Sequence, residues 1–279
     1  QGAAMKTGPF GLPIGLQLYT LGAAAAKDFE GTLRAVAEIG YREIELPGGQ
    51  LGKPVPEILA LFEKYGLTCP SLHTSMIELQ SNAHSRIEIA RELGAKYLVC
   101  SFPWTADGRF KSNFLGLASG ITLDDWKWNA EQLNRIGELA KKAGIRLGYH
   151  NHNMEFRSYD GVVAFDELLR LTDPQLVAIE LDIAWVVTAG ADPVAYLKEH
   201  AARIELLHVK DVRKDLQVGA NVLKPQTTEL GNGRIDWPRV FRAMNPAHIR
   251  HYFVEQENFE RDPLDSVRID FEYLHRLEV

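Results

Sequence analysis

The fold of this chain is decided by residues 145–210, which read IRLGYHNHNMEFRSYDGVVAFDELLRLTDPQLVAIELDIAWVVTAGADPVAYLKEHAARIELLHVK. Short apolar segments, typical of buried strands, occupy residues 145–152, 177–183 and 205–210. Segments with the spacing of amphipathic helices lie between them, at residues 163–171 and 193–202. This stretch therefore predicts strands and helices in alternation, which is the pattern of a parallel sheet covered by helices.

The same alternation extends toward both ends of the chain. Further strands are predicted at residues 14–20, 41–46, 67–74, 97–102 and 251–257. Further helices are predicted at residues 29–39, 55–65, 83–93, 123–143, 237–244 and 263–277, and Thr122 with Asp125 resembles a capping box. Eight strand–helix units, about 33 residues apart, predict a (β/α)8 TIM barrel. It forms a single domain over residues 13–279, after a flexible N-terminal extension at residues 1–12.

A doubly wound open sheet is the alternative fold for such an alternation. An open sheet of that kind carries a glycine-rich phosphate-binding turn after its first strand. Here the first strand ends in Tyr19-Thr20-Leu21-Gly22-Ala23, without the G-x-G-x-x-G pattern. The sequence therefore favours the closed barrel.

Charge and hydropathy argue against two classes of partner. The 279 residues include 31 basic and 37 acidic ones, and the net charge of −6 argues against nucleic acid. No apolar run approaches the roughly 20 residues of a membrane helix, so no membrane partner is expected. The sequence starts QGAAMKTGPF. We expect a cytoplasmic protein, or a periplasmic one if this start reflects removal of a signal peptide.

Ionisable side chains gather at the ends of the last four predicted strands. On each strand, one set of alternate residues starts small or apolar and becomes polar toward the end of the strand. The four sets are Gly148, His150, His152; Ala178, Glu180, Asp182; Leu206, His208, Lys210; and Phe253, Glu255, Glu257. Inward residues alternate along barrel strands, and active sites lie at the carboxyl ends of the strands. Burial of so many ionisable groups is costly unless they are paired or bind a metal. The pattern predicts one divalent cation at the barrel mouth, with salt-bridged rim groups as the alternative.

The predicted metal ligands are Asp182, His208 and Glu255, with a fourth from the fifth strand. The alternation of inward residues along the fifth strand indicates His150 as the fourth ligand. Glu155 follows the strand and would add a third carboxylate, which better neutralises a divalent ion, so we favour Glu155 slightly and expect His150 to face the substrate. Mixed carboxylate and imidazole ligands suit Mn²⁺ or Zn²⁺ first, with Mg²⁺, Co²⁺ and Fe²⁺ as alternatives.

Lys210 lies two residues after His208 and points to the same face of its strand. It could stabilise an oxyanion or bind a sugar hydroxyl. A salt bridge with Asp182 or Glu180 is the alternative for Lys210.

Three further residues are candidate substrate contacts. Trp104 and Trp185 follow the fourth and sixth strands, where an aromatic ring can form the wall for a sugar face, although loop packing would explain them equally well. His73 ends the third strand and is expected either to contact substrate or to be a hydrogen-bonded rim residue.

Several segments together resemble a known superfamily. They are GLQLYT (15–20), YHNHNMEF (149–156), ELDIAW (180–185), LLHVKD (206–211) and FVEQEN (253–258). Over nearly its whole length the chain resembles the xylose-isomerase-like barrel superfamily, which holds sugar phosphate isomerases and epimerases, ketose 3-epimerases, inosose dehydratases and an apurinic-site endonuclease branch. The resemblance implies a TIM barrel with a metal held after strands five to eight.

The resemblance carries over residue by residue at three of the four ligand positions, Asp182, His208 and Glu255. Where many relatives have Glu-Asn-His on the fifth strand, this chain has His150-Asn151-His152. In epimerase relatives that glutamate also shuttles protons, so a two-carboxylate epimerase would need Glu155 in its place. The histidine-rich segment is similar to that of the inosose dehydratases.

The chemistry that the resemblance implies is proton abstraction next to a carbonyl, through a metal-stabilised enediolate. Candidate bases are His150, His152, Glu155 and Glu257. We expect a sugar isomerase or epimerase first. A lyase is second, either a dehydratase of the inosose type or an enzyme that eliminates across an oxidised (3-keto) glycoside.

The substrate is expected to be an unphosphorylated sugar, cyclitol or glycoside, because the sequence has no P-loop and no arginine cluster at its strand ends. A nuclease for abasic DNA would need a basic groove and more metal ligands, and a non-catalytic sugar-binding barrel is the remaining class. The long segments 105–120 and 212–231 could be lids or contacts in a homo-oligomer.

Overall fold

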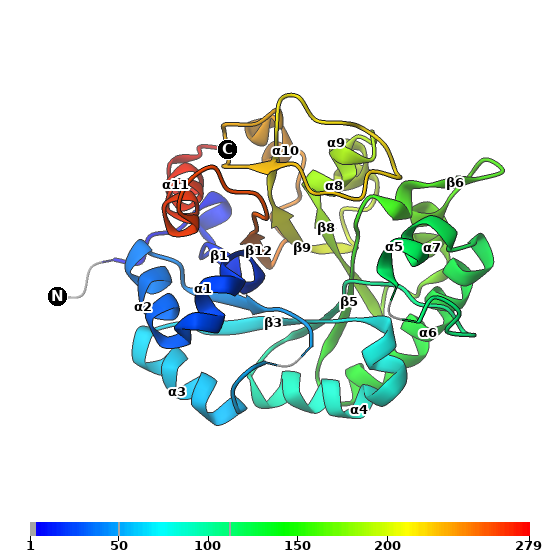
Figure 1. Ribbon diagram of the computed structural model, residues 1–279, viewed down its shortest axis with the longest axis horizontal. Helices are drawn as coiled ribbons and strands as arrows, with labels where there is room; N and C mark the ends of the chain where they lie inside the picture. The colour runs from blue at the N-terminus through cyan, green and yellow to red at the C-terminus, as the bar shows by residue number, and fades with distance from the viewer. Residues whose placement is uncertain (1–3, 50, 112) are drawn as a thin grey trace.

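The computed structural model describes residues 4–49, 51–111 and 113–279, and it contains the closed barrel that the sequence predicts (Figure 1). All neighbouring barrel strands are parallel, in the order β1-β12-β9-β8-β5-β4-β3-β2. The barrel strands are β1 (Gly15–Gln17), β2 (Glu43–Leu46), β3 (Thr68–Thr74), β4 (Tyr97–Cys100), β5 (Arg146–His150), β8 (Val177–Asp182), β9 (Ile204–Val209) and β12 (His251–Val254).

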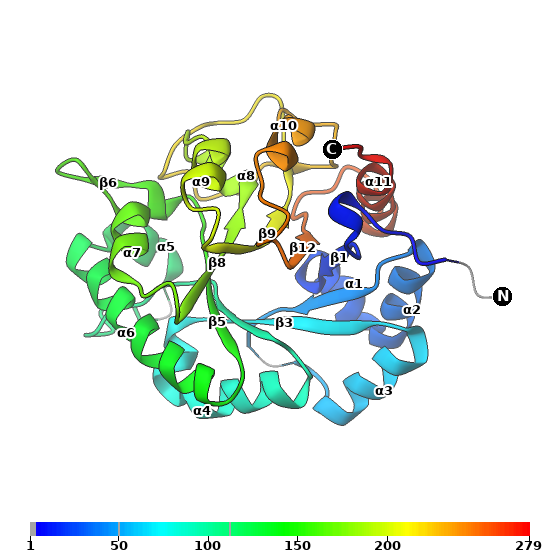
Figure 2. The same ribbon diagram turned by 180° about the vertical axis from the view of Figure 1, so that it is seen from behind.

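A ring of helices surrounds the strands. It consists of α2 (Phe29–Ile39), α3 (Val55–Tyr65), α4 (Met76–Glu92), α6 (Leu123–Lys142), α7 (Ala164–Leu171), α9 (Pro193–Glu199), α10 (Trp237–Arg242) and α11 (Pro263–Arg276). Short helices α1 (Gly22–Lys27), α5 (Phe114–Gly120) and α8 (Ile183–Thr188) lie in connections that follow strands. The last helix, α11, packs beside α2 and closes the ring (Figures 1 and 2). None of the described helices has the length and apolar character of a membrane span.

Local capping explains where two of these helices begin. Thr122 and Asp125 form the predicted capping box of α6, with Asp125 N 3.2 Å from Thr122 Oγ1. Helix α4 begins seven residues before the prediction of residue 83, because Ser75 and Glu78 form a second capping box that the helical periodicity did not show. At Asn82 the backbone leaves the helical region (φ −162°), so the predicted helix is the second half of α4.

The bottom of the barrel is filled by an apolar plug. Its inward side chains, all buried, are Tyr97, Val99, Ala178, Leu206 and Phe253. On β1 a Cβ at Gly15 would lie 2.6 Å from the Phe253 ring, so only glycine leaves room for that ring. The plug forces the polar residues that follow it on the same strands toward the carboxyl end of the barrel.

The segment before β1 packs against the outside of the barrel. Tyr252 Oη donates a hydrogen bond to the Pro9 carbonyl at 3.0 Å, and the Phe10 ring lies 5.8 Å from Phe241 of α10. Thr7 and Pro13 form an isolated antiparallel bridge. Of the extension predicted at residues 1–12, residues 1–3 lie outside the described part of the chain.

The long connection after β9 is organised by one buried carboxylate, Asp211. It starts the small antiparallel pair β10 (Asp211–Val212) and β11 (Thr227–Thr228). Its oxygens accept hydrogen bonds from Gly231 N at 3.0 Å, Ile235 N at 3.2 Å and Trp237 Nε1 at 3.0 Å. Asp211 therefore ties the loop to the start of α10.

The replacement Asp211→Ala should destabilise the protein by about 3 kcal/mol or more, because it leaves several buried N–H groups without an acceptor. Chemical denaturation measures the change. Asp215→Ala is the matched control, since Asp215 is exposed in the same loop and pairs only with Arg213. Equal stability of the two variants would contradict the role given to Asp211.

Candidate active site

Two layers of polar side chains lie above the apolar plug. The inner layer contains Gln17, Glu45, Ser71, His73, His150, Glu180 and His208, all buried. The outer layer contains Asp182, Lys210, Glu255 and Glu257. Strand register accounts for their proximity, because β8 places Asp182 beside His208 of β9 and Glu180 beside His150 of β5.

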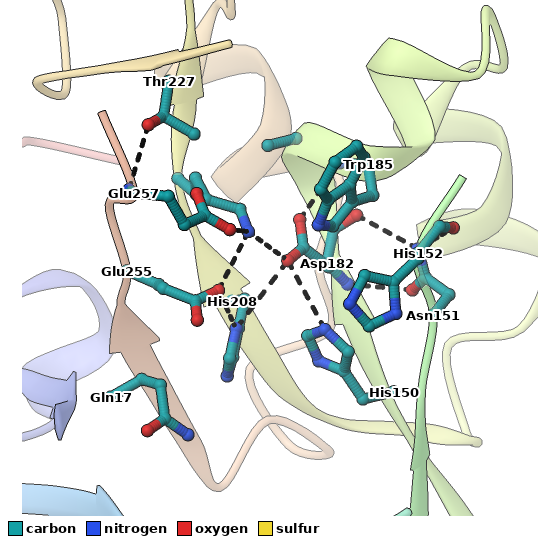
Figure 3. Close-up of polar contacts among 12 residues, drawn as sticks. Gln17, His150, Asn151, His152, Asp182, Trp185, His208, Thr227, Glu255 and Glu257 are labelled. Carbon is teal, nitrogen blue, oxygen red and sulfur yellow. Dashed lines mark hydrogen bonds and ion pairs between the residues drawn. The ribbon is translucent and has the colours of Figure 1, made fainter. Parts of the chain in front are cut away.

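The three ligands that the sequence predicts meet where the two layers join, Asp182 and Glu255 from the outer layer and His208 from the inner one. His208 Nδ1 lies 3.0 Å from Glu255 Oε2 and 3.7 Å from Asp182 Oδ2 (Figure 3). Ligand atoms around a divalent ion, each about 2.1 Å from it, are about 3.0 to 3.5 Å apart. Asp182, His208 and Glu255 therefore have the chemistry and the spacing to hold a metal ion.

Asp182 is held with one oxygen directed at this group. Its Oδ1 accepts the backbone N–H of Trp185 at 3.0 Å and so caps α8, while its own N–H donates to Asn151 Oδ1 at 2.9 Å. The other oxygen, Oδ2, is buried without a hydrogen bond and lies 3.0 Å from Lys210 Nζ. Asp182 Oδ2 is thus already paired with a cationic side chain, and a carboxylate oxygen of this kind can also bind a metal ion.

His150 lies beside this group without being one of its three members, and it belongs to a second cluster with His73, Glu180 and His208. Its Nε2 lies 3.6 Å from Asp182 Oδ2, and the two side chains face one another in Figure 3. Glu155, which the sequence analysis favours, is not part of the group. Its Oε1 accepts a hydrogen bond from Tyr149 Oη at 2.7 Å and its Oε2 accepts one from His152 N at 2.8 Å. Both oxygens are thus committed to the turn after β5.

Lys210 lies among three carboxylates. Its Nζ is 3.0 Å from Asp182, 2.8 Å from Glu255 and 2.8 Å from Glu257. Although burial opposes the charge, these carboxylates raise the pKa of Lys210 well above its usual range. Against its own burial, Glu255 has a pKa held below the usual range by Lys210 and His208. The salt bridge with Asp182, which was the alternative for Lys210, is present, and its other two partners are Glu255 and Glu257, which follow β12.

Glu257 and His152 lie on opposite sides of Asp182 (Figure 3). Burial raises the pKa of Glu257 to about 7, even though Lys210 opposes the shift, and its Oε2 has no hydrogen-bond partner. Burial and the Lys210 ammonium lower the pKa of His152 to about 3, so this imidazole is neutral, and its Nδ1 is also without a partner. Each side therefore presents one free polar atom.

A family model described as Xylose isomerase-like TIM barrel matches residues 33–277. The chain belongs to this family. The resemblance seen in the sequence is thereby confirmed, and the outer layer occupies the mouth of a xylose isomerase-like barrel.

Relatives of this xylose isomerase-like chain include two inosose dehydratases. The one from Clostridium perfringens is 30% identical over 186 residues, 61% of this chain and 60% of that protein, so the match spans less than two thirds of the relative. The one from Geobacillus kaustophilus is 26% identical over 270 residues, 88% of this chain and 86% of that protein. A sugar phosphate isomerase/epimerase from Parabacteroides distasonis matches with a TM-score of 0.78 and 26% identity, over 99% of this chain and 95% of that one.

The aromatic candidates have different places in this barrel. The Trp185 ring lies 5.6 Å from His152 and 5.3 Å from Lys210 Nζ, so it borders the outer layer. Trp104 is fixed by backbone hydrogen bonds with the side chain of Asn129. It lines a 330 Å³ cavity with Ile77 of α4 and Trp128 of α6, and that cavity is not lined by outer-layer residues.

His73 belongs to the inner layer. Its Nε2 lies 2.7 Å from Glu180 Oε2 and 2.9 Å from Glu45 Oε1, so it is a hydrogen-bonded residue of the barrel interior and that nitrogen is not left free for a substrate. Against the effect of its burial, the two carboxylates raise the pKa of His73 to about 10.

Sequence reasoning missed Glu45 and gave Glu180 no role of its own. In β2, the sequence Glu43-Ile44-Glu45-Leu46 also alternates polar and apolar residues, as the ends of the last four strands do. The prediction of inward polar residues covered only those last four strands. Asn151, which joins the ends of β5 and β8 through Asp182, had no signal in the sequence beyond its position in the histidine segment.

Replacement of Glu155 by Gln should change how stability depends on pH. Burial raises the pKa of Glu155 from an ordinary 4.5 to about 7. The folded state thus keeps this proton up to a higher pH than the unfolded state does. The wild-type protein therefore loses stability as pH rises from about 4.5 to 7. The Glu155→Gln variant lacks this loss, so its stability relative to wild type should rise by on the order of 3 kcal/mol across the window.

Urea denaturation at several pH values measures this difference. Glu138→Gln on the exposed face of α6 is the control, and its stability relative to wild type should stay constant with pH. A constant difference for Glu155→Gln as well would show that folding does not raise the pKa of Glu155.

Proposed function

We propose that this chain is a divalent-metal-dependent lyase that removes a proton next to the carbonyl of a keto cyclitol or keto sugar and expels the β-hydroxyl as water. The observation that carries the proposal is the convergence of Asp182, His208 and Glu255 beside a Glu257 carboxyl that is held by Lys210. Its relatives named as inosose dehydratases support this type of reaction.

Asp182, His208, Glu255 and His150 would hold the ion. Two imidazoles and two carboxylates are a donor set that suits Mn²⁺ or Zn²⁺, with Co²⁺, Fe²⁺ and Mg²⁺ as alternatives. When bound, such an ion acts as a Lewis acid that polarises a substrate carbonyl and makes the neighbouring C–H more acidic.

Glu257 is the proposed proton carrier. Its Oε1 is fixed at 2.8 Å by Lys210, and its Oε2 is buried and free, so this oxygen can approach a substrate carbon. A pKa near 7 suits a group that takes a proton in one step and returns it in the next. The proton of the broken C–H bond passes to Glu257 and then to the departing hydroxyl, and the C–H electron pair forms the new double bond.

His152 is proposed to orient the substrate from the opposite side. Its ring is stacked on Phe102 at 4.5 Å and its Nδ1 is free, so a neutral imidazole there can accept a hydrogen bond from a substrate hydroxyl. Trp185 borders the same space and would cover the apolar face of a sugar or cyclitol ring.

Isomerisation is the second candidate. A single group such as Glu257 can also return the proton to the adjacent carbon, which converts an aldose into a ketose. The Parabacteroides distasonis structure named as a sugar phosphate isomerase/epimerase supports this alternative. Epimerisation fits less well, because it needs a proton donor on the opposite face and His152 is held neutral there.

The double replacement Asp182→Ala, His208→Ala should abolish metal binding, because it removes two ligands. Elemental analysis after dialysis against Mn²⁺ or Zn²⁺ measures the metal content per chain. His150→Ala should weaken binding as well, whereas Glu155→Gln should retain the ion.

Full occupancy in the double variant would contradict the metal site. Loss of the ion in Glu155→Gln with retention in His150→Ala would instead support Glu155 as the fourth ligand.

The variant Glu257→Gln should keep the metal and lose about 10²- to 10⁴-fold in kcat on a keto cyclitol such as inosose, because the proton carrier is gone. Mass spectrometry of the reaction in deuterated water separates the two chemistries. Loss of water from the substrate indicates elimination, and deuterium uptake without loss of water indicates isomerisation.

Glu260→Gln is the matched control, since Glu260 is exposed three residues further along the same connection. It should keep the wild-type kcat. Unchanged kcat in Glu257→Gln would exclude Glu257 as the proton carrier. If the wild-type protein forms no product and exchanges no deuterium with any keto sugar or cyclitol, a non-catalytic binding protein would be favoured.

A further inference from the structure

Two buried carboxylates, Glu45 and Glu180, lie directly behind the proposed histidine ligands. Both are fully buried and come from β2 and β8. They are on the plug side of the imidazoles, whereas Asp182 and Glu255 are on the mouth side. Each of the two histidines therefore has carboxylates facing both of its ring nitrogens.

Glu45 fixes the ring of His208. Its Oε1 lies 2.6 Å from His208 Nε2, while His208 Nδ1 faces Glu255 and Asp182. An ionised carboxylate only accepts hydrogen bonds, so when the Nδ1 lone pair of His208 binds a metal ion, the remaining ring hydrogen lies on Nε2 and is donated to Glu45. Glu45 is itself held by Gln17 Nε2 at 2.9 Å and Ser71 Oγ at 2.6 Å, which prevents the carboxylate from turning.

Glu180 fixes the ring of His150 in a similar way, but here Nδ1 faces the supporting carboxylate and Nε2 faces the mouth. Its Oε2 lies 2.8 Å from His150 Nδ1, and His150 Nε2 faces Asp182 Oδ2. The hydrogen on Nδ1 leaves the Nε2 lone pair directed at the mouth. His150 can bind an ion at the mouth through Nε2 only in that tautomer, which the contact with Glu180 Oε2 favours.

His73 couples the two carboxylates. Its Nε2 lies within hydrogen-bond distance of both Glu45 and Glu180, and its ring is parallel to that of His208, with an interplanar angle of 5° and ring centroids 5.3 Å apart. The inner layer is therefore one connected network rather than two separate pairs.

We propose that Glu45 and Glu180 are positioning residues that set the tautomers of His208 and His150 and so create a two-histidine metal site. This inference rests on the proposed metal site at Asp182, His208 and Glu255. Carboxylates behind metal-bound histidines typically contribute 10- to 100-fold to metal affinity.

Calorimetric titration of the full chain with Mn²⁺ and with Zn²⁺ tests the proposal. The variants Glu45→Gln and Glu180→Gln should each bind the ion roughly 10- to 100-fold more weakly. Glu43→Gln is the matched control, because Glu43 is also on β2 and pairs with a histidine, His251 Nδ1, at 2.8 Å, but at the opposite end of the barrel. It should bind like the unsubstituted protein.

A second measurement needs no substitution. In the zinc-loaded wild-type protein, nitrogen-15 NMR of the histidine rings should show the hydrogen of His208 on Nε2 and that of His150 on Nδ1. Either ring in the opposite tautomer would overturn the proposal even if the variants fail to fold.

Affinities of Glu45→Gln and Glu180→Gln within twofold of wild type would also overturn it. Binding of two ions per chain, with the second lost in these variants, would overturn it too, because the inner layer would then be a metal site itself. Failure of the unsubstituted protein to bind either ion would refute the proposed metal site, and that result is distinct because it involves no inner-layer variant.

Discussion

The burial of charge at one end of the barrel is the constraint on which the site depends. Five carboxylates, three imidazoles and one ammonium meet there, almost all out of contact with water. Isolated charges in such a place would cost several kcal/mol each, so they are stable only as a mutually paired set. Lys210 and the histidines only partly balance the carboxylates, and this surplus of negative charge is what would attract a cation to the mouth.

The apolar plug and the polar layers depend on each other. Phe253, Leu206 and Ala178 close the lower half of the barrel, and the next inward residues on these strands are Glu255, His208 and Glu180. Because side chains alternate along a strand, each strand delivers an apolar residue and a polar one to successive levels. The plug excludes water from below, which strengthens the electrostatic interactions above it.

The polar residues divide into those that face the mouth and those that support them. Asp182, Glu255 and Glu257 present oxygens toward the space beside Lys210, and Asn151 and Trp185 hold Asp182 in place. Glu45 and Glu180 contact the ring nitrogens of His208 and His150 that face away from the mouth.

The barrel and the convergence of Asp182, His208 and Glu255 were predictable from the sequence, because the two-residue period of a strand and the 3.6-residue period of a helix can be recognised in neighbouring residues. The sequence did not determine the choice between His150 and Glu155, since both lie near the end of the same strand. Only the tertiary structure shows how the two are placed: the turn after β5 directs Glu155 to Tyr149, and strand register places Glu180 beside His150, which is why we propose His150. Contacts across a closed barrel join residues far apart in the chain, such as Glu45 and His208, and no local pattern encodes such a distance.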